Sequence, residues 1–282
     1  MKKLFKSNIQ RNPDTFPVYW SSNKYLAGKE WDNFGDALVP LLVERISGKK
    51  VVWTNKNAAV ANNNGLSKVF FTIGSILDQA KENNIVWGSG IMHSQKPIQK
   101  STFLAVRGPI SYSRVLASGQ HMEPIWGDPA LLCPFYFPVP KKTQTNTIAL
   151  VPHYVDYEAV NNKYKDEEGV IVIDLKDPDI PGVIEKIATA SMVFSSSLHG
   201  LIVAHAYGIK AAWVLFSDKL DGDDIKFNDY FMSVGIRLYK PFQYDDVLLT
   251  RKIASESLLP DLAVLQKVQL DLLHSCPFLE KA

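Results

Sequence analysis

The stretch MVFSSSLHGLIVAHA, residues 192–206, decides the fold of this chain. Apolar residues run into three serines, and the apolar residues of an expected helix follow at once. This order is typical of a strand, a tight turn and a helix in an α/β protein whose parallel sheet is covered on both faces. The start of such a helix offers unpaired N–H groups and the positive end of the helix dipole, which bind phosphate or carboxylate. We therefore predict an anion-binding turn at Ser195, Ser196, Ser197 and Gly200.

His199 lies in the first turn of this expected helix. A histidine in that place could exchange a proton with a bound anion or form a hydrogen bond to it. The alternative is structural: Ser197 caps the helix through its hydroxyl, and His199 packs as a polar residue with its hydrogen bonds made. The residues by themselves leave both interpretations open.

The pattern of strand, turn and helix recurs along the chain. A polar, proline-containing segment at residues 138–147 separates two such series and is the expected linker. We predict an α/β fold of two Rossmann-like lobes, residues 1–140 and 141–282, with the C-terminal helix able to pack back on the first lobe. Such lobes place a ligand cleft between them, at the carboxyl ends of the strands. The expected strands are 16–21, 50–53, 69–73, 85–87, 103–106, 148–151, 170–173, 192–195 and 211–216. The expected helices are 36–46, 180–190, 198–207, 258–273 and one after Arg107 that contains Ile110, Val115 and Leu116, with a proline near its first turn.

Composition narrows the function class. The net charge of +2 is too small for a nucleic-acid-binding surface, and no basic stripe is interleaved with aromatic residues. No apolar run reaches the ~18–20 residues that cross a bilayer, and the N-terminus lacks the apolar stretch of a signal peptide. The two cysteines lack the spacing of a metal site. We expect a cytoplasmic protein without a metal, a cofactor, a nucleic-acid partner or a transmembrane segment.

Several other turns could contribute to the site. Arg107 follows an expected strand, where a guanidinium can bind a carboxylate or phosphate through two hydrogen bonds; the alternative is a surface arginine. Asn33, Gly35 and Asp36 open the first expected helix, either as an N-cap or as a place where the backbone approaches a ligand. His153 ends the first strand of the second lobe.

Two glycine–serine turns follow strands of the first lobe, Gly74-Ser75 and Gly88-Ser89. Neither fits the G-x-G-x-x-G pattern of dinucleotide-binding folds or the phosphate-binding loop of NTPases. The turns are therefore expected to bind substrate by some other arrangement.

Taken in order, these motifs resemble the polysaccharide pyruvyl transferase family. The resemblance implies a fold like that of GT-B glycosyltransferases, phosphoenolpyruvate as donor, and a glycan or lipid-linked oligosaccharide as acceptor, with a cyclic pyruvate ketal as product. It implies that His199 is the functional histidine, as acid/base or phosphate ligand, and that Arg107 is the anion-binding arginine. Many members have arginine directly before the Leu-His pair, whereas this chain has Ser197. The motifs are Asn33-Phe34-Gly35-Asp36, Gly74-Ser75, Gly88-Ser89-Gly90, Val106-Arg107-Gly108-Pro109, Gly127-Asp128-Pro129-Ala130-Leu131 and residues 195–208.

The leading hypothesis is thus pyruvyl transfer during exopolysaccharide or cell-wall glycan synthesis, in the cytoplasm and, for a lipid-linked acceptor, at the inner face of the membrane. Two alternatives stay open. The first is a glycosyltransferase that uses a nucleotide-sugar, because the same architecture serves both reactions. The second is a non-catalytic glycan-binding relative.

Overall fold

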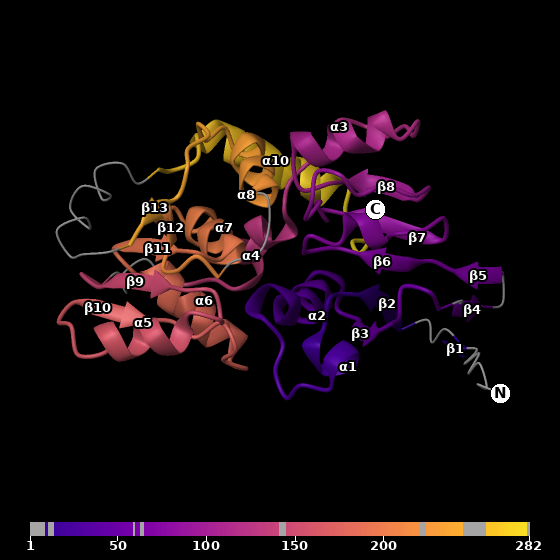
Figure 1. The fold of residues 1–282 in the computed structure, drawn as a ribbon. Coiled ribbons are helices and arrows are strands. Elements are labelled where there is room, and N and C mark those ends of the chain that lie inside the picture. Colours follow the sequence, from indigo (N-terminus) through magenta and orange to yellow (C-terminus); the bar gives the residue numbers. More distant parts are fainter. Residues whose placement is uncertain are drawn as a thin grey trace.

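The computed structural model describes residues 9–10, 14–58, 60–62, 65–140, 145–219, 224–244 and 258–280. The first large sheet contains five strands in the order β3-β2-β6-β7-β8, and every neighbouring pair is parallel (Figure 1). The five expected strands of the first half correspond to these five. They are β2 (Thr15–Tyr19), β3 (Lys50–Trp53), β6 (Val69–Phe71), β7 (Asn84–Trp87) and β8 (Thr102–Ala105).

The second large sheet has the order β10-β9-β11-β12-β13 and is also parallel throughout. The predicted α/β class with parallel sheets is therefore confirmed, and the likeness to the GT-B fold stays a prediction. So does the boundary at 140/141, which falls between the two sheets, beside residues 141–144 that lie outside the described part. The strands are β9 (Ile148–Val151), β10 (Val170–Val172), β11 (Met192–Ser195), β12 (Ala211–Leu215) and β13 (Phe242–Gln243).

A third, smaller sheet was not expected. It joins β1 (Ile9–Gln10), β4 (Val60–Asn62) and β5 (Gly65–Ser67), with β1 parallel and β5 antiparallel to β4. These strands are too short to show an alternating pattern of apolar residues, so no periodic signal predicts them.

Helices connect the parallel strands. The five expected helices correspond to α2, α3, α6, α7 and α10, whereas α1, α4, α5 and α8 had no predicted counterpart. The helices are α1 (Asn23–Ala27), α2 (Phe34–Ser47), α3 (Pro109–Ala117), α4 (Cys133–Tyr136), α5 (Tyr157–Tyr164), α6 (Ile180–Thr189), α7 (Leu198–Ala206), α8 (Ile225–Ser233) and α10 (Leu262–His274), with short 3₁₀ turns η1 (Leu77–Gln79) and η2 (Pro129–Leu132).

The C-terminal helix α10 lies against elements of the first half of the chain. The buried indole of Trp87 donates to the Leu272 carbonyl at 3.1 Å, and the Gln269 amide donates to the Leu131 carbonyl at 2.8 Å. A side-chain carbon on Gly127, whose φ is 152°, would lie 2.6 Å from Val268, so glycine lets the helix approach the turn before η2. The segment after α10 continues this packing over the first sheet.

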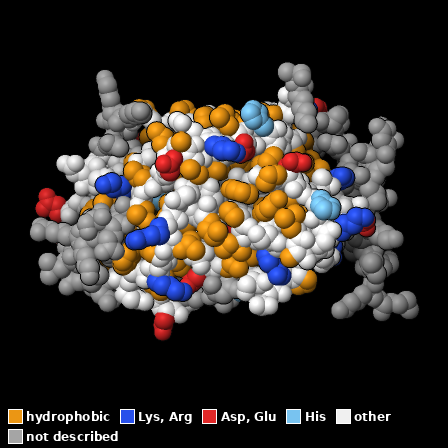
Figure 2. Space-filling model, turned by 90° about the horizontal axis from the view of Figure 1, so that it is seen from above, with side chains coloured by type: hydrophobic (Ala, Val, Ile, Leu, Met, Phe, Trp, Pro, Cys, Tyr) orange, Lys and Arg blue, Asp and Glu red, His pale blue; other side chains and the backbone are white. Residues whose placement is uncertain are grey.

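The outer side of α10 belongs to the face that Figure 2 shows, where hydrophobic side chains gather near the middle. Leu262 and Leu270 are 67% and 54% exposed, whereas Leu265 and Leu272 are buried. The helix therefore has apolar residues on both its buried and its exposed sides. No helix among the described residues is long and apolar enough to span a membrane.

Candidate active site

A pocket of ≈ 370 Å³ lies between elements of the first and second halves of the chain; we call it the central pocket. It contains seven of the fourteen residues that the sequence predicted for the site. The first half contributes residues that open α2 and follow β6, and the second half contributes residues that follow β9 and β11. The seven are Asn33, Asp36, Gly74, Ser75, His153, Ser197 and His199.

Two helices begin at this pocket. The N-cap residues are Asn33 for α2 and Ser197 for α7, and neither side chain makes a capping hydrogen bond. The structural alternative in which the Ser197 hydroxyl caps α7 is therefore wrong. Because a helix start presents unpaired N–H groups and partial positive charge, two uncapped starts make the central pocket favourable for an anion.

His199 is held between the two halves of the chain. Its Nε2 lies 3.7 Å from Oδ2 of Asp128, a fully buried carboxylate, and the ring is 12% exposed. On the other side, a side-chain carbon on Gly35 would lie 2.1 Å from Nδ1 of His199, so only glycine leaves room for the ring. The missing side chain of Gly35 thus leaves room for the imidazole of His199. The position of Asp128 determines that Nε2 is the ring nitrogen that faces a carboxylate.

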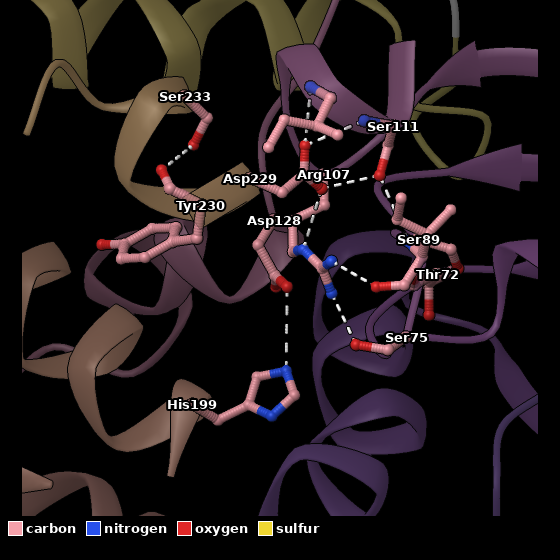
Figure 3. A network of polar contacts seen from close by, with 12 residues as sticks. Thr72, Ser75, Ser89, Arg107, Ser111, Asp128, His199, Asp229, Tyr230 and Ser233 are labelled. Carbon is pink, nitrogen blue, oxygen red and sulfur yellow. Dashed lines mark hydrogen bonds and ion pairs between the residues drawn. The ribbon is translucent and has the colours of Figure 1, made fainter. Parts of the chain in front are cut away.

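Arg107 lies behind the wall of the central pocket and does not line it. The guanidinium is fully buried: Nε donates to Asp229 at 3.2 Å, and the two terminal nitrogens donate to Ser75 Oγ at 2.6 Å and the Ile91 carbonyl at 2.7 Å (Figure 3). A side-chain carbon on Gly90 would lie 2.3 Å from its central carbon. In this structure Arg107 therefore contacts the pocket through the Ser75 hydroxyl, whose own hydrogen is left to donate elsewhere.

Asp229 completes this buried network from α8. Its Oδ1 accepts the backbone N–H groups of Ile110 and Ser111, both at 2.9 Å, and Oδ2 accepts the Ser111 hydroxyl at 2.6 Å. One carboxylate of the second half of the chain thus caps helix α3 of the first half and neutralises Arg107. The network joins the two halves next to the central pocket.

The glycine–serine turns of the first sheet differ in their roles. Gly74 and Ser75 line the pocket, and the backbone N–H of Gly90 donates to the Gly74 carbonyl at 3.0 Å. Ser89 is fully buried and donates its hydroxyl to the Thr72 carbonyl, and Gly88 (φ 94°) lies against Pro129. Gly88 and Ser89 thus support the turn from behind.

The three serines that precede α7 also differ in their roles. Ser195 is buried, with its hydroxyl 2.8 Å from the Val151 carbonyl and accepting the Ser197 N–H at 3.0 Å. Ser196 accepts the backbone N–H of His153 at 2.8 Å, and Gly200 lies inside α7, where a side chain would meet Ser195. Of the three serines, Ser197 alone is among the residues that line the central pocket.

Two titratable side chains of the pocket have shifted pKa values. Burial raises the pKa of Asp36 to about 8, the Asp32 carboxylate adds to the rise, and a hydrogen bond with the Ser21 backbone opposes it. Burial, together with Lys226, lowers the pKa of His153 to about 4 against the opposing effect of Asp156. At pH 7 both side chains are therefore mostly neutral.

We predict that Asp36→Asn removes a pH dependence of stability. The folded state holds a proton on Asp36 that the unfolded chain releases near pH 4, so wild-type stability falls as pH rises from about 4 to about 8. Between pH 5 and pH 9 the asparagine variant should gain ~2 kcal/mol or more relative to the wild type in urea unfolding. The exposed Asp166→Asn is the control, and parallel stability curves for wild type and Asp36→Asn would contradict the shifted pKa.

Sequence reasoning missed several residues of this site. Asp128 was named only as a member of a motif, without a role, although it faces His199, and Asp229 had no motif around it. Ser21, Asn23, Asp78, Lys96, Tyr154 and Lys226 also line the central pocket. Only the place of Asp128 in the motif Gly127-Asp128-Pro129-Ala130-Leu131 could have suggested a role for it. Among the described residues, no group of three or more histidine, cysteine or acidic side chains is placed to hold a metal ion.

Fold and pocket together define an α/β protein with two parallel sheets and a polar pocket between the two halves of its chain. The model of the polysaccharide pyruvyl transferase family matches residues 14–217, which include every residue of the central pocket except Lys226. The chain belongs to the polysaccharide pyruvyl transferase family and is a transferase. It is 30% identical over 215 residues to an uncharacterized protein of Acanthamoeba polyphaga mimivirus, and the match covers 72% of this chain and 71% of that protein.

Proposed function

We propose that this protein transfers a pyruvyl group from phosphoenolpyruvate to two hydroxyls of a glycan, forming a cyclic ketal, during exopolysaccharide or cell-wall glycan synthesis. The observation that supports this most is the meeting of two uncapped helix starts, α2 and α7, at the central pocket. A donor with a carboxylate and a phosphate needs oriented N–H groups at both anionic ends, and this pair of helices offers them.

The side chains of the central pocket favour the same donor. Lys96 and Lys226 line it, and of the two carboxylates, Asp36 is mostly neutral at pH 7 while Asp78 lies 3.3 Å from Lys96. The lining thus carries a net positive charge before any proton on His199 is counted. This charge balance suits a small anion better than a neutral sugar.

The reaction needs a proton donor for the methylene carbon of phosphoenolpyruvate and positive charge near the departing phosphate. Protonation of the methylene carbon of phosphoenolpyruvate makes the adjacent carbon electrophilic, and a sugar hydroxyl attacks that carbon. The C–O bond to phosphate then breaks and phosphate leaves. A second sugar hydroxyl attacks the same carbon and closes the ketal. His199, at the start of α7, would serve as acid/base or as phosphate ligand, and neutral Asp36 holds a second proton in the pocket.

In this proposal Arg107 is a positioning residue. Its buried guanidinium holds Ser75, and the Ser75 hydroxyl, with Ser197 and the amides of the helix starts, would contact the donor. The acceptor would be a polysaccharide unit or a lipid-linked oligosaccharide, and the latter would place the reaction at the inner face of the membrane.

Release of inorganic phosphate tests the proposal directly. We expect phosphate release from phosphoenolpyruvate that depends on a glycan with two suitably placed hydroxyls, and a mass increase of the glycan that matches one pyruvate ketal. Omission of the glycan is the first control. Nucleotide-sugars form the second arm: transfer of a sugar from one of them, without phosphate release from phosphoenolpyruvate, would replace this proposal by the glycosyltransferase alternative.

A further inference from the structure

A second pocket, of ≈ 270 Å³, lies beside the central pocket and contains three aromatic side chains, Trp20, Tyr25 and Trp31; we call it the aromatic pocket. The two pockets share a wall. Ser21 and Asn23 line the central pocket, whereas the neighbouring Trp20 and Tyr25 line the aromatic one. At the rim, the Trp31 ring lies 4.9 Å from the ring of Tyr154, which lines the central pocket. One elongated ligand could therefore reach both.

The indole N–H of Trp20 is a buried donor without an acceptor. Trp20 is 5% exposed, and its Nε1 has no hydrogen-bond partner among the described residues. In contrast, Nε1 of Trp53 donates to the Trp20 carbonyl at 3.1 Å, and that of Trp87 to Leu272. An unpaired buried donor costs free energy. The nitrogen itself is buried, so a ligand oxygen reaches it only when the indole shifts toward the pocket, and that contact would recover the lost free energy.

Helix α1 forms one side of the aromatic pocket and adds nothing to the core, because none of its residues is buried. It is fixed instead by polar contacts: the Ser22 hydroxyl caps it at Tyr25 N, 3.1 Å away, and donates to Asp32 at 2.9 Å. Tyr25 is 62% exposed, with its ring stacked 4.7 Å from that of Trp53. An exposed tyrosine whose ring is stacked on a second aromatic ring suits ligand contact better than core packing.

The charges of the aromatic pocket balance. Lys24 and Lys176 are opposed by Asp32 and Asp177, so the formal charge of the lining is zero. Unlike the central pocket, it offers no net attraction to an anion. Aromatic rings match the C–H face of a pyranose, and the charged side chains and the indole N–H match its hydroxyls.

We infer that the aromatic pocket binds a neutral pyranose unit of the acceptor glycan, next to the unit that is modified in the central pocket. The inference rests on the proposed function, since it assigns this sugar to the acceptor of pyruvyl transfer. The faces of Tyr25 and Trp31 contact the sugar ring, and a ring hydroxyl accepts the Trp20 indole N–H.

The test uses the full chain and three named probes, the β-methyl glycosides of galactose, glucose and N-acetylglucosamine. Saturation-transfer NMR without phosphoenolpyruvate should detect binding of at least one of these glycosides. Tyr25→Ala should raise the Kd of that glycoside about tenfold or more. Trp20→Phe keeps the ring and removes only the donor, and should weaken binding several-fold. The matched controls are Phe135→Ala, an aromatic residue that is 57% exposed and outside both pockets, and Trp87→Phe, whose N–H already has an acceptor.

The outcomes separate this inference from the proposed function. Glycoside binding that the Tyr25 and Trp20 variants weaken and the controls preserve supports the sugar site, even if phosphoenolpyruvate neither binds nor releases phosphate. Binding unchanged in Tyr25→Ala and Trp20→Phe, or no binding of any probe at 20 mM, overturns it, even if phosphoenolpyruvate is turned over normally. Circular dichroism of each variant shows that the fold is retained.

Discussion

Replacing Asp229 with alanine should lower the free energy of unfolding by ~3–5 kcal/mol, the cost of leaving a buried charge without its partner. Asp229 and Arg107 are both fully buried, and Asp229 also accepts two backbone N–H groups at the start of α3. The variant would leave the Arg107 guanidinium without a counter-charge and the N–H groups of Ile110 and Ser111 without an acceptor. A lower urea midpoint with an unchanged m-value is the expected measurement.

Two further variants show whether the buried charge is responsible. The double variant Arg107→Met with Asp229→Leu removes both charges, and it should recover part of the lost stability, because an apolar pair avoids the desolvation cost. Glu82→Ala breaks an exposed ion pair with Lys100 that is shorter, at 2.8 Å, and should leave the urea midpoint unchanged. Equal losses in Asp229→Ala and in the double variant would contradict the assignment to an unpaired charge.

Periodicity was sufficient to predict every strand of the two large sheets except β13 (Phe242–Gln243), which has only two residues. Strands such as β9 and β11 are buried apolar runs ended by turns, and their predicted bounds, 148–151 and 192–195, match the structure. Helix α8 was missed although its sequence holds a periodic signal. Phe227, Tyr230 and Phe231 are buried at the i, i+3, i+4 spacing of a helix face, but the helix has only nine residues and follows the acidic stretch Asp221–Asp224, of which residues 221–223 lie outside the described part.

The missing helix explains why the interpretation of Arg107 was incomplete. Its position after a strand was readable, but its direction depends on Asp229, 122 residues away, and on the space that Gly90 leaves. A sequence pattern holds no information on such a long-range partner. Close to His199 the same is true of Asp128 and Gly35, which approach the ring from different segments of the first half of the chain.

The serine turn shows the opposite case. Its helix start and the place of His199 followed from local order alone, because a strand, a turn and a helix lie within fifteen residues. The local order of residues did not show that the three serines have different roles. Ser195 and Ser196 bind neighbouring backbone groups, and Ser197 faces the pocket, which depends on how β9 lies beside β11.

His199→Ala should lower kcat/KM for phosphate release from phosphoenolpyruvate by ~10²–10⁴-fold, the range for loss of a general acid or base. The ring lines the central pocket at the start of α7, where a departing phosphate would be held. The fold should survive, because Asp128 keeps its hydrogen bond from the Ala130 N–H at 3.0 Å. His274→Ala, an exposed histidine on α10, is the control, and unchanged turnover in His199→Ala would remove this residue from the mechanism.

The variant His199→Gln separates the two roles proposed for this side chain. Glutamine can donate a hydrogen bond to phosphate but cannot transfer a proton at neutral pH. If His199 moves a proton, glutamine should be nearly as inactive as alanine, with KM for phosphoenolpyruvate close to that of the wild type. If His199 only binds phosphate, glutamine should recover most of the activity, and the alanine variant should show its loss mainly as a raised KM. Because Asp128 faces Nε2 at 3.7 Å, Asp128→Asn should share the kcat loss only in the proton-transfer case, where the orientation of the ring matters.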